Sequence, residues 1–140
     1  MSTIDRVEVI PFTFTVRDLG LGAHRAMGVS NLHYEKGATL SVMRYAVRVT
    51  TDDGASGAYV SHWVGTQAAL GQTVMLAPHL LGRNPEHREV IYDDLKRETR
   101  AYDGMGHGML DIALWDLVGR KYGISVATML GAFRTRLPTY

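Results

Sequence analysis

The sequence predicts an α+β domain in which a three-stranded antiparallel meander is followed by a helical bundle. Apolar residues alternate with period 2 in the amino-terminal part, and an Asp53-Gly54 dipeptide gives a strong hairpin signal. After Gly65 the apolar period lengthens to that of a helix and stays helical as far as Tyr122. We find no internal repeat, linker or low-complexity tract, so one domain is expected for 140 residues.

Three strands are expected, at residues 4–16, 39–50 and 56–64. In the first, Phe12, Phe14 and Val16 fall on one face, as a half-buried strand requires. The short connection around Asp53-Gly54 favours antiparallel pairing of the second strand with the third. Residues 17–37 lose the alternation and are rich in glycine, so we expect a long loop there. Loops of that length in compact domains are typically lids or binding loops.

Three helices are expected after the strands. The first begins with Thr66 as a plausible N-cap and ends before Pro78. The second starts at Asn84, which precedes a proline and an acidic residue, the usual order at a helix start. The third covers residues 105–122 and stops near Gly123.

The composition excludes several functional classes. The chain is 46% apolar and 21% charged, and its 15 Lys and Arg nearly balance its 14 Asp and Glu, so we expect no nucleic-acid partner. Cysteine is absent, which excludes disulfides, thiolate metal sites and cysteine nucleophiles. No apolar run approaches the roughly 20 residues that span a bilayer, and no signal peptide is evident, so we expect a cytoplasmic protein with no membrane partner.

The third helix is apolar almost all round. One stripe consists of Met105, Met109, Ile112 and Ala113, and another of Leu110, Leu114 and Leu117. A helix with this pattern is covered on more than one side, whereas the strands and the other helices cover one side. We therefore expect a second covering body, either a further domain or another subunit. The extended segment that begins at Arg134 agrees with a chain that continues into another domain.

A family resemblance is carried by residues 108–121, which read Gly-Met-Leu-Asp-Ile-Ala-Leu-Trp-Asp-Leu-Val-Gly-Arg-Lys. This segment resembles the helix that closes the capping domain in the mandelate racemase and muconate lactonizing enzyme family of the enolase superfamily. Residues 123–131 and 80–85 are similar to further motifs of the same family. The chain departs from the family pattern after Gly57, where a glutamate is often found, and at Ala132, where a second glycine is usual.

The resemblance implies a capping domain at residues 1–134, with residues 135–140 beginning the first strand of a modified TIM barrel that this chain lacks. It implies that the whole protein removes the proton α to a carboxylate with a Lys or His base, while Mg²⁺ stabilises the enediolate. Base and metal ligands would all lie in the barrel. No catalytic and no metal-binding residues are therefore expected in this chain, which is expected to be inactive alone.

The resemblance implies that this domain covers the barrel mouth as a lid, and its polar residues suit a hydroxylated substrate. An acid-sugar dehydratase, a lyase, is therefore the leading activity for the whole protein. A racemase, epimerase or cycloisomerase of the same superfamily is the alternative, because the same enediolate serves all of them. A stand-alone non-catalytic binding or oligomerisation module is the alternative from a different class. The implied partners are the chain's own carboxy-terminal barrel domain, a small carboxylate substrate and further copies in a homo-oligomer.

The resemblance places residues 17–37 and 61–66 over the barrel mouth, where they would select the substrate. The candidate substrate-binding residues are His24, Arg25, His33, Tyr34 and Trp63. Arg25 suits a carboxylate, histidines suit hydroxyl groups, and Trp63 suits stacking on a sugar face. The alternative is a solvated loop surface for the first four residues and ordinary packing against the barrel for Trp63.

Two other features of the sequence are expected to be structural. Asp111 and Asp116 lie on the apolar helix, where a buried carboxylate needs a partner, so ion pairing is expected rather than catalysis. Residues 103–108 are rich in glycine but lack the spacing and the ending of a phosphate-binding loop. Their glycines are expected to permit close packing at the start of the third helix.

Overall fold

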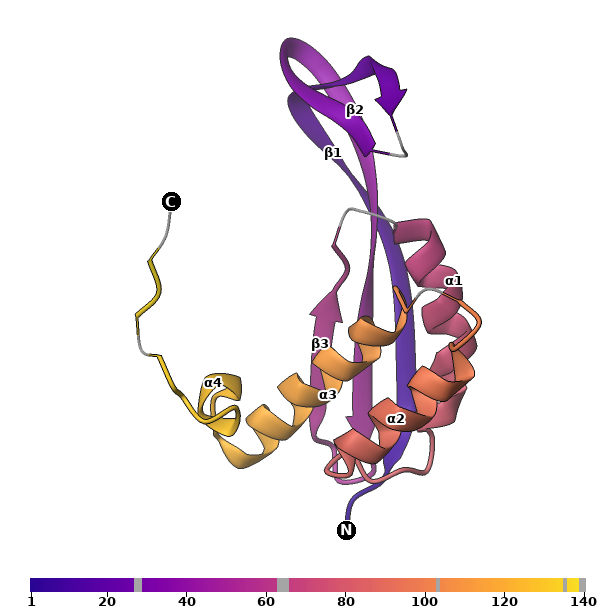
Figure 1. The fold of residues 1–140 in the computed structure, drawn as a ribbon, viewed down its shortest axis with the longest axis vertical. Helices are drawn as coiled ribbons and strands as arrows, with labels where there is room; N and C mark the ends of the chain where they lie inside the picture. The colour runs from indigo at the N-terminus through magenta and orange to yellow at the C-terminus, as the bar shows by residue number, and fades with distance from the viewer. Residues whose placement is uncertain (27–28, 63–65, 103, 135, 139–140) are drawn as a thin grey trace.

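The computed structural model describes residues 1–26, 29–62, 66–102, 104–134 and 136–138, and the side chains of residues 21–32 also lie outside the description. A layer of helices covers one face of a sheet with strand order β1-β2-β3 (Figure 1). The strands are β1 (Ile4–Ala26), β2 (Val29–Thr51) and β3 (Ser56–Val60). The helices are α1 (Thr66–Leu76), the 3-10 helix η1 (Ala77–Leu80), α2 (Arg88–Glu98), α3 (His107–Tyr122) and α4 (Val126–Met129). The predicted α+β meander with helices is confirmed.

The expected loop at residues 17–37 is wrong, because β1 and β2 continue through it as a two-stranded ribbon. Antiparallel pairing runs on from Arg17↔Thr39 to Ala26↔Val29, with irregular register on the way. Figure 1 shows the ribbon rising past the helices and curling over at its tip. Period-2 alternation arises only where one face of a strand is buried, so a ribbon without a helix layer lacks that signal.

The ribbon changes direction at an irregularity between Arg17 and Leu19. Asp18 adopts a φ of 58° and Gly37 a φ of 83°, both in the left-handed region. The Gly37 N–H donates to Asp18 Oδ1 at 2.7 Å, which holds the two strands together where the regular ladder is interrupted. Irregularities of this kind increase the local twist, and here the twist aims the ribbon tip away from the body of the sheet.

The Asp-Gly turn forms between β2 and β3 as predicted. Gly54 has a φ of 85°, and its N–H donates to the Thr51 carbonyl at 2.8 Å. The Asp53 carboxylate accepts from Thr51 Oγ1 at 2.6 Å and pairs with Lys121 Nζ at 3.0 Å. The Thr51 hydroxyl first, and then Lys121, hold the pKa of Asp53 well below its usual range. The turn is thereby tied to the carboxy end of α3.

Several element boundaries differ from the predicted ones. Helix α2 begins at Arg88 rather than at Asn84, because Asn84 Oδ1 accepts from the Glu86 N–H at 2.9 Å and closes a separate turn. Helix α3 begins at His107 rather than at residue 105, and β3 ends at Val60 rather than at residue 64. Short helix α4 was not predicted.

Helix α3 is the centre of the core. Its buried apolar residues are Met109, Leu110, Ala113, Leu114 and Leu117, and they pack with Tyr45, Val47 and Val49 of β2. It ends as predicted at Gly123, whose φ of 65° supplies a left-handed cap, and the Ile124 N–H donates to the Gly119 carbonyl at 2.9 Å.

Two glycines bring backbone against backbone on either side of α3. A Cβ atom on Gly57 of β3 would overlap the Leu117 amide nitrogen and the Ala113 carbonyl oxygen. A Cβ on Gly106 would lie 2.5 Å from the Thr73 nitrogen and 2.7 Å from the Ala69 oxygen of α1. The predicted packing role of the glycines before α3 is confirmed for Gly106.

A buried chain of hydrogen bonds joins helix α1 to strand β2 and to the start of helix α3. The Tyr45 hydroxyl lies 2.9 Å from Thr73 Oγ1, and Thr73 Oγ1 donates to the Gly106 carbonyl at 3.0 Å. Burial raises the pKa of Tyr45, so the phenol stays neutral.

Within the residues that the structure describes, no helix is both long enough and apolar enough to cross a membrane.

Candidate functional site

The ribbon formed by β1 and β2 at residues 17–37 carries two candidate substrate-binding residues whose side chains the structure describes. His33 and Tyr34 are neighbours in β2, so their side chains leave opposite faces of the ribbon. Tyr34 is 77% exposed. His33 Nε2 lies 3.2 Å from Glu35 Oε2, and the two side chains lie over the bare backbone of Gly20, where a Cβ would be 2.5 Å from Glu35 Oε2. The structure thus pairs His33 with Glu35 and separates both from Tyr34.

The other three candidates lie outside the described side chains. His24 and Arg25 belong to β1 by their backbone, and Arg25 pairs in register with Ser30, but their side chains are outside the description. Trp63 lies outside the described residues altogether. The assignment of all five residues to a substrate therefore stays a prediction. Glu35 was missed because the segment was interpreted as a loop, whereas strand residues two apart share a face.

The second lid segment, residues 61–66, is fixed at both ends. The Ser61 N–H donates to the Tyr45 carbonyl at 2.9 Å, and Ser61 Oγ accepts from the Tyr45 N–H at 3.1 Å. Thr66 Oγ1 donates to the His62 carbonyl at 2.8 Å at the start of α1. Figure 1 shows that β3 ends, and α1 begins, toward the end of the sheet from which the ribbon rises. The described ends of residues 61–66 therefore lie at the same end of the domain as the ribbon.

An apolar hollow of about 400 Å³ lies between β3, α3 and α4. It is lined by Ala58, Tyr59, Asp111, Ile112, Trp115, Asp116, Val126 and Leu130. Ile112 is 40% exposed and Leu130 is 66% exposed, although both are large and apolar. Figure 1 shows the carboxy-terminal segment leaving the fold beside this face. We call the surface formed by Ile112, Trp115, Val126 and Leu130 the α3–α4 face.

Asp111 lies at the rim of the α3–α4 face, where it pairs with an arginine that stacks on Trp115. The Arg88 guanidinium carbon lies 3.3 Å from the centre of the Trp115 ring, and Arg88 Nε lies 3.7 Å from Asp111 Oδ1. Burial raises the pKa of Asp111, and the charge of Arg88 opposes that shift. Structural pairing of Asp111, as expected from the sequence, is confirmed, but its partner Arg88 could not be identified from spacing.

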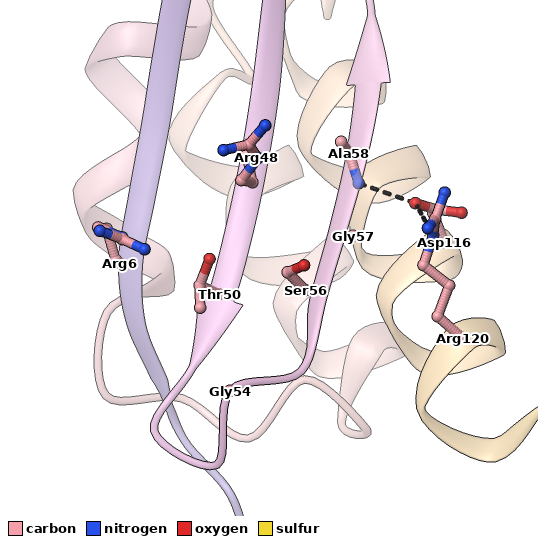
Figure 2. Close-up of a pocket in the computed structure, with 9 residues that line it drawn as sticks. All are labelled: Arg6, Arg48, Thr50, Gly54, Ser56, Gly57, Ala58, Asp116 and Arg120. Atoms are coloured by element: carbon pink, nitrogen blue, oxygen red, sulfur yellow. Dashed lines mark hydrogen bonds and ion pairs between the residues drawn. The ribbon is translucent and has the colours of Figure 1, made fainter.

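A second hollow, of about 460 Å³, lies on the sheet face opposite the helices and is lined by arginines and by Asp116 (Figure 2). Asp116 Oδ2 accepts from the Ala58 N–H at 2.9 Å and from Arg120 Nε at 2.8 Å, which joins α3 to β3. The remaining arginines face Glu8 Oε2, with Arg6 Nε at 3.7 Å and Arg48 Nη1 at 3.9 Å. This confirms the structural pairing expected for Asp116. Both other arginines share the single carboxylate of Glu8, so basic groups outnumber acidic ones around this hollow.

The described residues do not fit a divalent metal. No group of three His, Cys, Asp or Glu side chains is arranged to hold an ion among them. Mg²⁺ prefers an octahedral set of oxygen ligands, and the carboxylates described above are each engaged by arginine, lysine or backbone N–H groups.

The fold and these surfaces define an α+β capping domain with a two-stranded ribbon at one end and an exposed apolar face at its side. The family described as "Mandelate racemase / muconate lactonizing enzyme, N-terminal domain" matches residues 35–131, which is more than half of the chain. The chain therefore belongs to this family, within the enolase superfamily. The resemblance of residues 108–121 had predicted this membership, and it is confirmed.

A "D-galactonate dehydratase family member" of Streptomyces bingchenggensis is 34% identical over 102 residues, which cover 68% of this chain and 25% of that protein. A solved enolase-superfamily member from Agrobacterium tumefaciens is 28% identical, with a TM-score of 0.69, over 94% of this chain and 38% of that one.

L-talarate dehydratase of a Polaromonas species, solved with Mg and L-glucarate, shares the fold with a TM-score of 0.72 and 21% identity. The match covers 96% of this chain and 36% of that chain. This chain thus spans about a quarter of the length of the curated relative.

Proposed function

We propose that this chain is the substrate-specificity lid of a Mg²⁺-dependent enzyme that abstracts the proton α to a carboxylate, and that the enzyme is an acid-sugar dehydratase. The observation that carries the proposal is the β1–β2 ribbon, which extends beyond the helix layer at the end of the sheet where β3 ends and α1 begins (Figure 1). Family membership supports the reaction class, and the dehydratases among the similar proteins support an acid-sugar substrate.

The α3–α4 face is the proposed seat of the catalytic barrel. Apolar surface at Ile112 and Leu130 is left uncovered in a domain whose core is otherwise complete, and patches of this kind mark interaction sites. The carboxy-terminal segment leaves beside the same face, so a barrel that begins at residues 135–140 would follow directly. With the barrel against this face, residues 1–134 form the cap and the ribbon tip reaches toward the barrel mouth.

The ribbon tip offers the chemistry that a hydroxylated carboxylate requires. The His33–Glu35 pair presents a ring nitrogen and a carboxylate for hydroxyl groups, and Tyr34 presents a phenol on the opposite face. Arg25 would add a guanidinium for the substrate carboxylate, with His24 beside it, and Trp63 an aromatic face for the sugar carbons.

The metal ligands and the base belong to the barrel in this proposal, because the described residues of the cap do not fit Mg²⁺. When bound, Mg²⁺ stabilises the charge of the enediolate that forms after α-proton removal. The cap contributes binding, orientation and exclusion of water, which together decide which substrate reaches the base.

Replacing Trp63 or Tyr34 with alanine in the full-length protein is expected to change the ratio of kcat/KM between two acid sugars by about tenfold. The reason is that each substitution removes a contact to one part of the substrate. The Mg²⁺ concentration for half-maximal activity should not change, because neither residue ligates the metal in this proposal. Steady-state kinetics on a panel of acid sugars at several Mg²⁺ concentrations measures both quantities.

His79→Ala is the matched control for these substitutions. His79 is exposed in η1, which lies against the start of β1 and away from the ribbon tip. It should leave both the substrate ratios and the Mg²⁺ response unchanged. A large loss of Mg²⁺ affinity in Trp63→Ala, with substrate ratios preserved, would remove this residue from the lid.

A further inference from the structure

Gly20 of β1 lies directly opposite His33 of β2 in the ribbon. Strand residues two apart share a face, so Glu35 lies on the same face as His33. A Cβ atom on Gly20 would be 2.5 Å from Glu35 Oε2, 2.8 Å from His33 Nε2 and 3.0 Å from His33 Cε1. The two side chains therefore occupy the space that a side chain at position 20 would fill, and Gly20 itself is buried.

The conformation of the backbone does not require glycine at position 20. Gly20 is not one of the residues with a positive φ, so an L-amino acid could adopt its conformation. The three atoms nearest to an added Cβ all belong to the ends of the His33 and Glu35 side chains. Glycine inside a strand often marks a bulge, a bend or a close approach by another group, and here two polar side chains make that approach. What the glycine supplies is room for the contact between them.

The contact between His33 and Glu35 lies next to the bend of the ribbon. Gly37 follows Glu35 by two residues, and its N–H donates to Asp18 Oδ1 at 2.7 Å. Asp18 in turn precedes Gly20 by two residues. A hydrogen bond across the strands therefore holds both sides of the bend beside the pair. Side chains on backbone that is fixed in this way present their polar atoms in a defined place, as a binding site requires.

The His33–Glu35 pair contributes little to the stability of the fold. The two side chains are 47% and 60% exposed, and water screens the attraction between solvated charges. Figure 1 shows that this part of the ribbon lies beyond the helix layer that covers the core. A polar contact that is built over a glycine at the exposed end of the domain is better explained by what it presents to a ligand.

The contact fixes which nitrogen of the His33 ring carries the proton. His33 Nε2 lies 3.2 Å from Glu35 Oε2, and a carboxylate has no hydrogen to donate. Nε2 is therefore the donor, and in the neutral ring Nδ1 keeps its lone pair. Among the residues that the structure describes, no group donates to Nδ1. The ring is thus set to accept one hydrogen bond from a ligand.

We propose that Glu35 is a positioning residue for His33, and that the pair makes the lid select carboxylates with a hydroxyl group within reach of His33 Nδ1. Gly20 provides the room in which the two side chains meet. The substrate hydroxyl would donate to Nδ1, whereas an analogue without it would leave the nitrogen desolvated and unpaired. A site of this kind rejects such an analogue more strongly than an apolar pocket could. The proposal rests on the lid function proposed above.

Long-range ¹H–¹⁵N correlation spectra of the imidazole rings in the full-length protein test the contact without any turnover. The His33 signals, assigned by their loss in His33→Gln, should show the proton on Nε2 alone. Gly20→Ala should divide the ring between its two tautomers, because the added Cβ displaces the ends of both side chains. Gly71→Ala, where a Cβ meets nothing within 4 Å, is the control and should leave the signals unchanged. A His33 ring that is already divided in the unsubstituted protein would overturn the proposal.

A double-mutant cycle in the full-length protein tests the role of the pair in substrate selection. Glu35→Gln should lower the ratio of kcat/KM between an acid sugar and at least one of its monodeoxy analogues about tenfold, mainly through KM. In a His33→Ala background the same substitution should have no further effect, because Glu35 acts through His33. Glu98→Gln, which changes an exposed carboxylate on α2, is the control and should leave the ratio unchanged. Additive effects of Glu35→Gln and His33→Ala would overturn the proposal.

The two measurements distinguish a failure of the dehydratase assignment from a failure of the positioning role. If the protein turns over no acid sugar while His33 keeps its proton on Nε2, the dehydratase assignment fails and the positioning by Glu35 stands. If acid sugars are turned over but Gly20→Ala and Glu35→Gln change neither the tautomer nor the substrate ratios, Glu35 is not a positioning residue and the dehydratase assignment stands.

Discussion

Replacing Gly57 with alanine is expected to lower the free energy of unfolding by about 3 kcal/mol or more, the largest stability effect in this domain. The added Cβ would overlap the amide nitrogen of Leu117 and the carbonyl oxygen of Ala113, and would lie 2.6 Å from Leu117 Cα. All three are backbone atoms of α3, so no side-chain rotation relieves the overlap. Helix α3 must move off β3, which opens the core around Leu114 and Leu117.

Urea unfolding followed by circular dichroism measures this change. Gly71→Ala is the control, because a Cβ at Gly71 would meet nothing within 4 Å and the residue lies inside helix α1. Alanine in that position should stabilise the domain by roughly 0.5–1 kcal/mol. If Gly57→Ala unfolds at the same urea concentration as the original sequence, the close β3–α3 packing described here is wrong.

Replacing Ile112 with aspartate is expected to reduce the activity of the full-length enzyme by about 100-fold, the equivalent of roughly 3 kcal/mol in the seating of the cap. Ile112 is 40% exposed in this domain, so the substitution should change the domain's own stability by less than about 1 kcal/mol. Under a barrel, however, the new carboxylate would be buried without a partner. The substitution should therefore lower the activity and weaken the association of the cap with the barrel. The free energy of unfolding of the cap itself should change little.

Val74→Asp is the matched control for Ile112→Asp. Val74 is an exposed apolar residue on α1. Figure 1 shows α1 at the edge of the helix layer that lies away from α4 and the carboxy terminus. Its activity should stay within about twofold of the unsubstituted enzyme. Limited proteolysis provides a second measurement, because a displaced cap exposes the connection near Arg134. Full activity in Ile112→Asp would contradict the assignment of the α3–α4 face to the barrel.

Sequence reasoning succeeded where one face of an element is buried. Strand β2 and helix α3 carry clear periods because Val47, Val49, Leu110 and Leu114 all face the same core. The ribbon beyond Arg17 was missed because both its faces lie outside the helix layer, and backbone pairing alone leaves no periodic pattern. The start of α2 was misplaced because Asn84 closes a turn of its own, which has the same residue types as a helix cap.

The candidate site was predictable only in part. Family resemblance predicted two lid segments, and that role stays a prediction. Neither spacing nor composition could show that Glu35 accompanies His33 across Gly20. The partners of Asp111 and Asp116 also depended on tertiary packing, since Arg88 and Ala58 come from α2 and β3.

Dehydration of an acid sugar by the full-length protein is the most direct measurement of the function that we propose for this domain. A panel of acid sugars should be incubated with the enzyme in Mg²⁺ and again in excess EDTA, with keto-acid product detected by its semicarbazone absorbance. Turnover of at least one acid sugar is expected in Mg²⁺, and none is expected in EDTA. Racemisation or cycloisomerisation without dehydration, or turnover that persists in EDTA, would contradict it.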